Sequence, residues 1–169
     1  YISFDGTNDA LTSLSNLPLG HDFTIFEVSK ITKDSDSSVF GYKAVRGQIQ
    51  MGIDTNGKYN VRVNDGTYDL SVSTTDDAHG DYHIGIMHFH NKRVHLEYYD
   101  ALGSFNNTDT NSSFDHEFTF NTASFDIGKY YTSHDMQGEF NELIIFNRQL
   151  TDAEIADVKG YLNLKYKIY

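Results

Sequence analysis

Apolar and polar residues alternate on both sides of a short polar segment, and this pattern limits the fold more than any other in the chain. The apolar members are two residues apart, as on the buried face of a strand: Ile49, Met51, Ile53, Tyr59, Val61 and Val63. A two-residue Asn56-Gly57 turn would place the two apolar sets on opposite faces. A three-residue loop that ends at Gly57 pairs Ile53 with Tyr59 and keeps both sets on one face. We therefore predict a β-hairpin with the longer loop and with Gly57 in the left-handed conformation.

A second hairpin is predicted directly after the first. Asp65-Gly66 is typical of a two-residue turn, which pairs Val63 with Tyr68 and again keeps the apolar residues on one face. Three consecutive strands would then form an antiparallel meander with one buried face.

The last part of the chain predicts a covered strand followed by a helix. Residues 143–146 are all apolar, as in a strand that is covered on both faces. Thr151 and Glu154 form a capping box, and Leu150 and Ile155 are spaced as a hydrophobic staple. The chain would therefore close with a core strand, a corner and an amphipathic helix that packs on the body.

Short strands and turns continue along the chain without βαβ alternation, and about 11 to 13 strands are expected. There is one proline, Pro18, and no Pro/Ser-rich linker. We predict one domain over residues 1–169. The fold class is all-β, an antiparallel two-sheet jelly-roll sandwich with one short C-terminal α-helix.

Two motifs at the ends of the chain resemble a known family. They are GEFNELIIFNRQLTDAEIADVKGYLNLKY at residues 138–166 and FDGTND at residues 4–9. Together they resemble the laminin-G-like, concanavalin A-like jelly-roll domains of bacterial and phage surface proteins. The resemblance covers essentially the whole chain and implies the same sandwich fold. Lectins, glycanases and structural modules all use this fold, so the resemblance alone does not fix the function.

Charge and composition exclude several classes of function. The formal net charge is −11, and the 13 basic residues form no cluster, which argues against nucleic acid and anionic membrane surfaces. No apolar run approaches the roughly 20 residues of a membrane-spanning helix. The absence of cysteine excludes disulfides and thiolate zinc sites. The chain begins at Tyr1 without Met, and we expect it to be a domain of a larger extracellular, cell-surface or virion protein.

A catalytic role is not expected. β-Glucanases with this fold carry two carboxylates in a Glu-x-Asp-x-Glu strand, and that motif is missing here. Glu139 and Glu142 are three residues apart, which predicts that they point to opposite faces of their strand.

The opening segment suggests calcium. Asp5, Asn8 and Asp9 supply three oxygen-bearing side chains within five residues. The resemblance implies that Glu142 lies on a strand near the first one and that Ca²⁺ binds near loops of this kind. The alternative is that Asp and Asn cap the backbone of their own turn.

A histidine pair is a further metal candidate. A hairpin around Asn91-Lys92 places His88 opposite His95, and imidazoles paired across strands can bind Zn²⁺ or Ni²⁺. Histidines two residues apart on a strand are also common on ordinary polar faces. We expect a polar sheet face there, without metal.

A glycan site is predicted on a rim loop. Tyr130, Tyr131, His134 and Asp135 combine aromatic rings with hydrogen-bonding groups between two predicted strands. A sugar ring would stack on Tyr130 or Tyr131, with Asp135 accepting from its hydroxyls. Binding would be weak, roughly 0.1 to 1 mM per site. Several copies, in a homo-oligomer or a multi-copy assembly, would then be needed.

We therefore predict a non-catalytic, lectin-like module for glycans or cell-surface polysaccharide. The alternative is a structural or assembly module, such as a decoration, fibre or adhesin domain that contacts protein. An open strand edge or an exposed apolar patch would favour that alternative.

Overall fold

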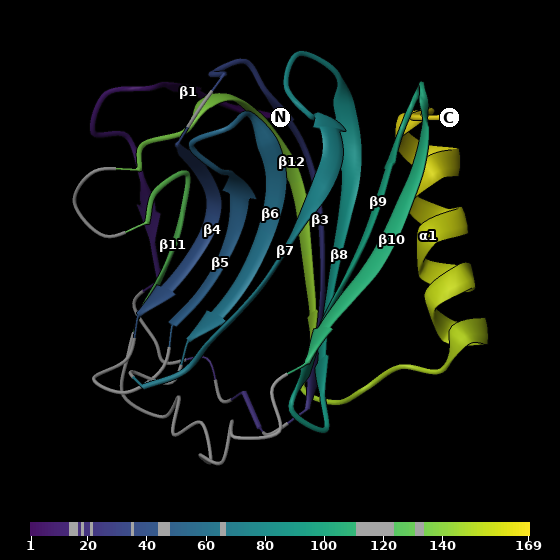
Figure 1. The fold of residues 1–169 in the computed structure, drawn as a ribbon. Coiled ribbons are helices and arrows are strands. Elements are labelled where there is room, and N and C mark those ends of the chain that lie inside the picture. Colours follow the sequence, from purple (N-terminus) through teal and green to yellow (C-terminus); the bar gives the residue numbers. More distant parts are fainter. Residues whose placement is uncertain are drawn as a thin grey trace.

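A computed structural model describes residues 1–13, 17, 19–20, 22–34, 36–43, 48–64, 67–110, 124–130 and 134–169. In these ranges the chain forms two antiparallel sheets of six strands each, stacked face to face, and one helix (Figure 1). Sheet A has the strand order β1 (Ile2–Asp5), β12 (Gln137–Phe146), β3 (Phe23–Ile31), β8 (Tyr82–His90), β9 (Arg93–Asp100) and β10 (Gly103–Thr110). Sheet B has the order β2 (Leu11–Thr12), β11 (Phe125–Ile127), β4 (Ser37–Lys43), β5 (Gln48–Ile53), β6 (Lys58–Asn64) and β7 (Asp69–Asp77). The helix is α1 (Asp152–Tyr166). The predicted jelly-roll sandwich with a C-terminal helix is confirmed.

The helix covers one face of one sheet. Phe23 and Ile25 of β3 point into the core between the sheets, whereas Phe26 and Val28 point outward and pack in a second cluster with Leu162 of α1. Figure 1 shows α1 along the outer side of sheet A. Sheet A is therefore buried on both faces, and sheet B has an apolar cover on one face only. Among the described residues, no helix is long and apolar enough to cross a membrane.

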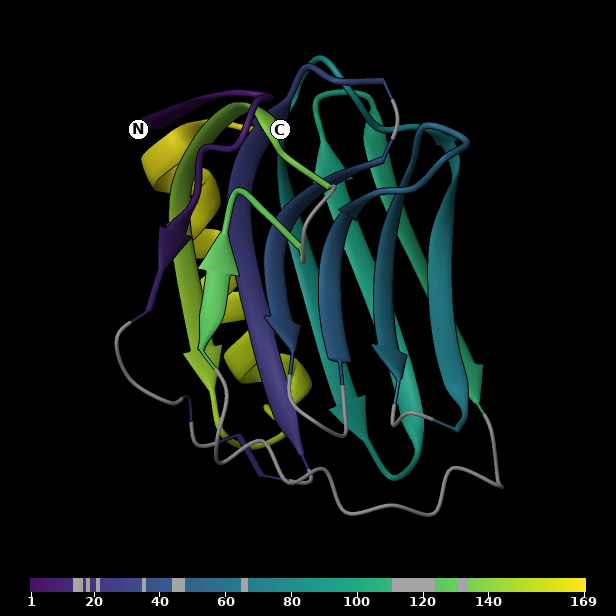
Figure 2. The same ribbon diagram turned by 90° about the vertical axis from the view of Figure 1, so that its left-hand side faces the viewer.

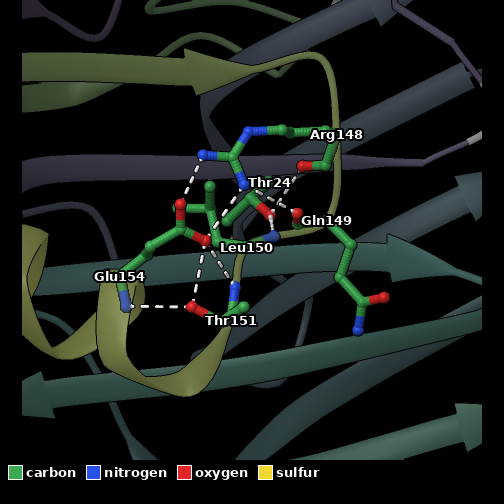
Figure 3. Close-up of polar contacts among 6 residues, drawn as sticks. All are labelled: Thr24, Arg148, Gln149, Leu150, Thr151 and Glu154. Carbon is green, nitrogen blue, oxygen red and sulfur yellow. Dashed lines mark hydrogen bonds and ion pairs between the residues drawn. The ribbon is translucent and has the colours of Figure 1, made fainter.

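The predicted capping box starts the helix (Figure 3). Thr151 Oγ1 accepts from the Glu154 backbone N–H at 3.3 Å, and the Thr151 N–H donates to Glu154 Oε2 at 2.8 Å. Arg148 donates to the other oxygen of Glu154 at 2.6 Å. Thr24 of β3 accepts from the Leu150 N–H at 3.3 Å, which ties the corner to sheet A. The start of the helix is thus fixed by its own cap and by the sheet beneath it.

The first predicted hairpin is confirmed. Ile53 pairs with Tyr59, and Gly57 has a φ of 78°, in the left-handed region. The Gly57 N–H donates to the Asp54 carbonyl at 3.1 Å, and the Asp54 N–H donates to the Lys58 carbonyl at 2.8 Å. The apolar pattern therefore selected the correct loop length.

The register of the second hairpin was predicted wrongly. Val63 pairs with Leu70, not with Tyr68, and Asn64 pairs with Asp69. The error is two residues, which leaves every side chain on its predicted face. Residues 65 and 66 lie outside the described residues. The apolar alternation fixes the face of a strand, but it cannot separate registers that differ by two.

Residues 103–110, which carry few apolar side chains, form edge strand β10. The segment carries little apolar surface because it lies at the edge of sheet A, where the Asp109 carboxylate accepts from the Ser71 N–H of sheet B at 3.0 Å. Low hydrophobicity was therefore a poor guide to strand content at this edge.

The histidine hairpin has the predicted register, but its face is not open. His88 pairs with His95, and His88 is only 7% exposed on the α1 side of the sheet. The His88 ring lies 3.2 Å from Glu97 Oε1, and Tyr99 donates to Glu97 Oε2 at 2.5 Å. Burial raises the pKa of Glu97, but these two hydrogen bonds outweigh it and lower the pKa to about 2. The expected absence of metal at this pair stays a prediction.

A polar cluster lies inside the sandwich. Tyr59 of sheet B donates to Glu27 Oε1 of sheet A at 2.6 Å, and His83 Nε2 lies 2.8 Å from the same oxygen. All three side chains are fully buried. Gly85 has no side chain, which makes room for the Tyr59 hydroxyl, since a Cβ at this position would lie 2.2 Å from it. Burial, with the nearby Glu27, raises the pKa of Tyr59 far above its usual range, so its hydroxyl stays a donor.

Candidate functional site

The outer face of sheet B is polar and faces away from the helix. Figure 2 looks onto this sheet, with α1 behind sheet A on the far side. Because successive side chains in a strand alternate between faces, the residues between the core positions of β5, β6 and β7 point outward. They include Gln48, Gln50, Asn60, Arg62, Ser71 and Ser73. This face is therefore rich in hydrogen-bonding groups.

A hollow of about 210 Å³ lies on this face. Its lining comes from the segment before β4, from β5 and its following loop, from β6, and from one residue of the segment before β12. The lining residues are Asp36, Gln50, Gly52, Ile53, Asp54, Thr55, Asn60, Arg62 and His134. At Gly52 a Cβ would lie 2.1 Å from the Ser37 carbonyl, so only glycine lets β4 approach β5 this closely.

Hydrogen bonds fix the polar groups at the floor of the hollow. Asp54 Oδ1 accepts from the backbone N–H groups of Asn56 at 2.8 Å and Lys58 at 3.1 Å. Asp54 Oδ2 accepts from Ser73 at 3.0 Å, and Ser73 Oγ in turn accepts from the Asn60 side-chain amide at 3.0 Å. These side chains are thus held in place before any ligand arrives.

Arg62 supplies the positive charge of the hollow. Its Nε lies 2.8 Å from both carboxylate oxygens of Asp69, and Nη2 also donates to Asp69. These hydrogen bonds raise the pKa of Arg62 further above its already high value. A guanidinium has five N–H groups, and the Asp69 contact engages those on Nε and Nη2.

Only part of the predicted glycan-binding set lies at the hollow. His134 lines the hollow, with its Nε2 2.9 Å from Asp36 Oδ1. Tyr130 lies beside it, edge-on to the His134 ring at 5.6 Å between centroids, and donates to Gln48. The Tyr130 side chain is 8% exposed and crosses over Gly41, where a Cβ would lie 2.9 Å from its ring. The predicted stacking of a sugar on Tyr130 is incompatible with this burial.

The other two predicted residues do not enter the hollow. Asp135 forms an ion pair with Lys129 at 3.0 Å and is not among the lining residues. Tyr131 lies outside the described residues. Glycan binding by this set stays a prediction, and the structure assigns only His134 to the hollow.

Sequence reasoning missed most of the hollow. Asp54, Asn60 and Arg62 were not singled out, although the alternation that identified the core also marks the intervening Asn60 and Arg62 as outward. A polar residue at every outward position of β6 is the signal that could have found the site.

The predicted calcium ligands are not brought together. Asp5 pairs with Gln137 on β12, so Glu142 lies five positions away, roughly 16 Å along the strand. The Asp5 carboxylate accepts from the Thr7 N–H at 2.7 Å, and the Asp9 carboxylate accepts from the Asp5 N–H at 3.2 Å. The opening segment therefore caps its own turn, as the alternative held. Asn8 has a φ of 59° in that turn.

Glu142 contacts the helix. Its carboxylate binds Lys165 at 3.0 Å and accepts from the hydroxyl of Tyr166 at 3.0 Å. Within the described ranges no three His, Cys, Asp or Glu side chains are grouped so that they could hold a metal ion.

The predicted opposite orientation of Glu139 and Glu142 is also wrong. The β12–β3 register shifts between Phe140 and Glu142, so Glu139 faces Lys30 and Glu142 faces Val28. Residues directly opposite each other point to the same side, and both β3 partners point outward. The extra residue in this bulge, Asn141, brings both carboxylates to the α1 side of sheet A.

Comparison with known proteins supports the fold. No family model matches the sequence, and no curated protein matches it significantly. Among solved structures, the LG1-3 region of the laminin α2 chain matches with a TM-score of 0.72 and 13% identity, over 90% of this chain and 32% of that one. This chain thus spans about a third of that laminin structure.

Two further neighbours have bound sugars in their structures. The CBM40 of the Ruminococcus gnavus IT-sialidase, bound to α2,3 sialyllactose, matches with a TM-score of 0.68 and 14% identity, over 93% of this chain and 94% of that one. Domain 4 of AbnA, a GH43 extracellular arabinanase from Geobacillus stearothermophilus, in complex with arabinotriose, matches with a TM-score of 0.64 and 18% identity, over 92% and 74%. At these identities the likeness establishes the laminin-G-like jelly-roll fold.

Proposed function

We propose that this domain is a non-catalytic carbohydrate-binding module and that a glycan binds in the hollow on sheet B. The observation that carries the proposal is a hollow lined by fixed hydrogen-bonding side chains on the face of sheet B that looks away from the helix. Sugar hydroxyls both donate and accept, and the lining offers partners for both roles.

The lining residues would contact a bound sugar in different ways. Arg62 donates to sugar oxygens, and the carboxylates of Asp36 and Asp54 accept from sugar hydroxyls. His134 presents its ring at the side of the hollow, supported by Tyr130. Both carboxylates have partners in the protein, Asp36 with His134 and Asp54 with Ser73, which hold them in place for a sugar.

Two sugar-bound neighbours support the same ligand class, since their structures contain sialyllactose and arabinotriose. AbnA is an extracellular enzyme, which supports our proposal of an extracellular or surface location for this domain. Weak binding by one shallow hollow, roughly 0.1 to 1 mM, would require several copies in one assembly.

The test is a glycan array probed with the unaltered domain and with an Asn60→Ala, Arg62→Ala double variant. We expect the double variant to lose binding while its fold is retained. Ser71→Ala is the matched control, because Ser71 is an exposed outward residue on β7 outside the hollow. Retained binding in the double variant would move the site elsewhere.

Calcium is tested in the same experiment. Calcium stays a proposal from the family resemblance and does not rest on Asp5, Asn8 and Asp9, since Asp5 and Asp9 cap their own turn. If calcium is needed, an array run in EDTA should show weaker binding. If the unaltered domain binds no glycan with or without EDTA, the structural or assembly role becomes the better account.

A further inference from the structure

Tyr82 and Tyr161 are two of the exposed tyrosines on the outer side of sheet A. Tyr82 at the start of β8 is 36% exposed, and Tyr161 on α1 is 48% exposed. Both belong to the opposite side of the molecule from the hollow, because sheet A lies between them and sheet B (Figure 1). They are therefore unconnected with the site proposed above.

Each ring is held by a carboxylate of β12. The Tyr82 hydroxyl donates to Glu139, and the Tyr161 hydroxyl donates to Glu142 Oε1 at 3.3 Å. The hydrogen bond to Glu139 raises the pKa of Tyr82 to about 12, so this hydroxyl remains a donor at neutral pH. The bulge at Asn141 makes the arrangement possible, since it turns both carboxylates to the same face.

A lysine accompanies each pair. Lys30 Nζ lies 5.7 Å from the centre of the Tyr82 ring, and Lys165 Nζ lies 5.4 Å from the centre of the Tyr161 ring. Lys165 also binds Glu142 at 3.0 Å. The surface therefore holds two similar groups of one tyrosine, one glutamate and one lysine, and the charges within each group cancel.

The two groups are close enough for one ligand. Glu139 lies opposite Lys30 and Glu142 opposite Val28, which are two positions apart on β3. That spacing is about 7 Å along the strand. A short oligosaccharide would span both groups.

We propose that Tyr82, Tyr161, Glu139 and Glu142, with Lys30 and Lys165, form a second carbohydrate-binding surface for neutral glycans, here called the tyrosine platform. Exposed aromatic rings present apolar planes to the C–H face of a sugar, and the neighbouring carboxylates accept from its hydroxyls. The hydroxyl anchors hold the rings in place, so little conformational freedom is lost on binding. Because the charges cancel, the platform offers no net charge to attract a strongly acidic or basic partner.

The domain would then hold glycan on two opposite outer faces. The ligand class follows the proposed function, but the platform shares no residue with the hollow, so each site can fail without the other.

The test is a two-dimensional NMR titration of the isotope-labelled domain with maltohexaose, cellohexaose and xylohexaose. We expect two groups of shifted amide signals, one around the hollow and one around the start of β8 and the end of α1. A Tyr82→Ala, Tyr161→Ala variant should raise the Kd of the second group about tenfold and leave the first unchanged. Leu164→Ala, which removes another exposed side chain from α1, is the matched control and should change neither.

The outcomes separate the two sites. Shifts at the platform alone would support this inference and refute glycan binding in the hollow. Shifts at the hollow alone would refute the platform and leave the proposed function standing. Platform shifts that depend on protein concentration and need no sugar would identify self-association at this surface and overturn the inference. A Tyr82→Phe, Tyr161→Phe variant keeps the rings and frees the carboxylates, so weaker platform binding in this folded variant would support the anchoring role.

Discussion

The outer faces of the two sheets differ in what they present. On sheet A, Phe26 and Ile86 point outward, are fully buried and pack in the cluster that includes α1. On sheet B, Asn60 and Arg62 of β6 point outward and line the hollow. Both sheets bury apolar residues on their inner faces, so the two sheets differ only in the residues on their outer faces. An apolar outer face requires a cover, which the C-terminal helix provides, whereas a polar one is free to meet a ligand.

The largest effect should come from truncation on the covered face. Phe26→Ala removes a fully buried ring that packs edge-on against Phe146 at 6.1 Å, and we expect a loss of about 3 to 5 kcal/mol in the free energy of unfolding. Ser71→Ala, outward on sheet B, should change it by less than about 0.5 kcal/mol. Urea denaturation measures both, and similar losses would contradict the contrast between the faces.

A smaller effect is expected at the loop that carries Asp54 into the hollow. Gly57→Val forces a β-branched residue into a φ of 78° and should cost about 1 to 3 kcal/mol. Gly160→Ala is the control, because no atom lies within 4 Å of a Cβ there and alanine favours the helix. That variant should gain up to about 1 kcal/mol. An unchanged midpoint for Gly57→Val would count against a strained loop.

Loss of the helix cap should have a more modest effect. Thr151→Ala removes the acceptor for the Glu154 N–H and should lower stability by about 1 kcal/mol, with glycan binding in the hollow unchanged. Gln149→Ala, exposed in the same corner, should have almost no effect. Equal denaturation midpoints for the two variants would show that the cap adds nothing.

The smallest effect should be that of the surface ion pair beside the hollow. Arg62 and Asp69 are about 40% exposed, at 39% and 41%, so Arg62→Ala should cost only about 0.2 to 1 kcal/mol. The cost should shrink between about 0.05 M and 0.5 M salt because the charges are screened. A large loss that salt does not change would mean that Arg62 is a structural residue, and its use as a binding probe would then fail.

The sequence predicted the fold well where a one-residue error would have moved side chains to the wrong face. Gly57 and its hairpin are the example, because only one loop length kept Ile53 and Tyr59 together. The pairing of Val63 failed because a shift of two residues leaves the faces unchanged. The orientation of Glu139 failed for a related reason. A bulge adds one residue and reverses the alternation, and nothing in the local composition marks Asn141 as its position.

The candidate site was harder to predict because it is assembled across strands. Asp36, Asp54, Arg62 and His134 come from four separate segments, and their proximity depends on the order of strands in sheet B. Alternation indicated which side chains point outward, but not which neighbours they meet. The rim loop was nevertheless a partial guide, since His134 does reach the hollow.

The hydrogen bond between Tyr59 and Glu27 has a mechanical consequence. Apolar packing between two sheets is non-directional and tolerates small sliding or rotation, whereas a buried hydrogen bond has a required length and angle. This bond joins β6 to β3 through the core, so it fixes the position of sheet B relative to sheet A at this point. Because β6 carries part of the hollow and β3 lies beneath the tyrosine platform, ligands on the two faces would be held at one fixed angle.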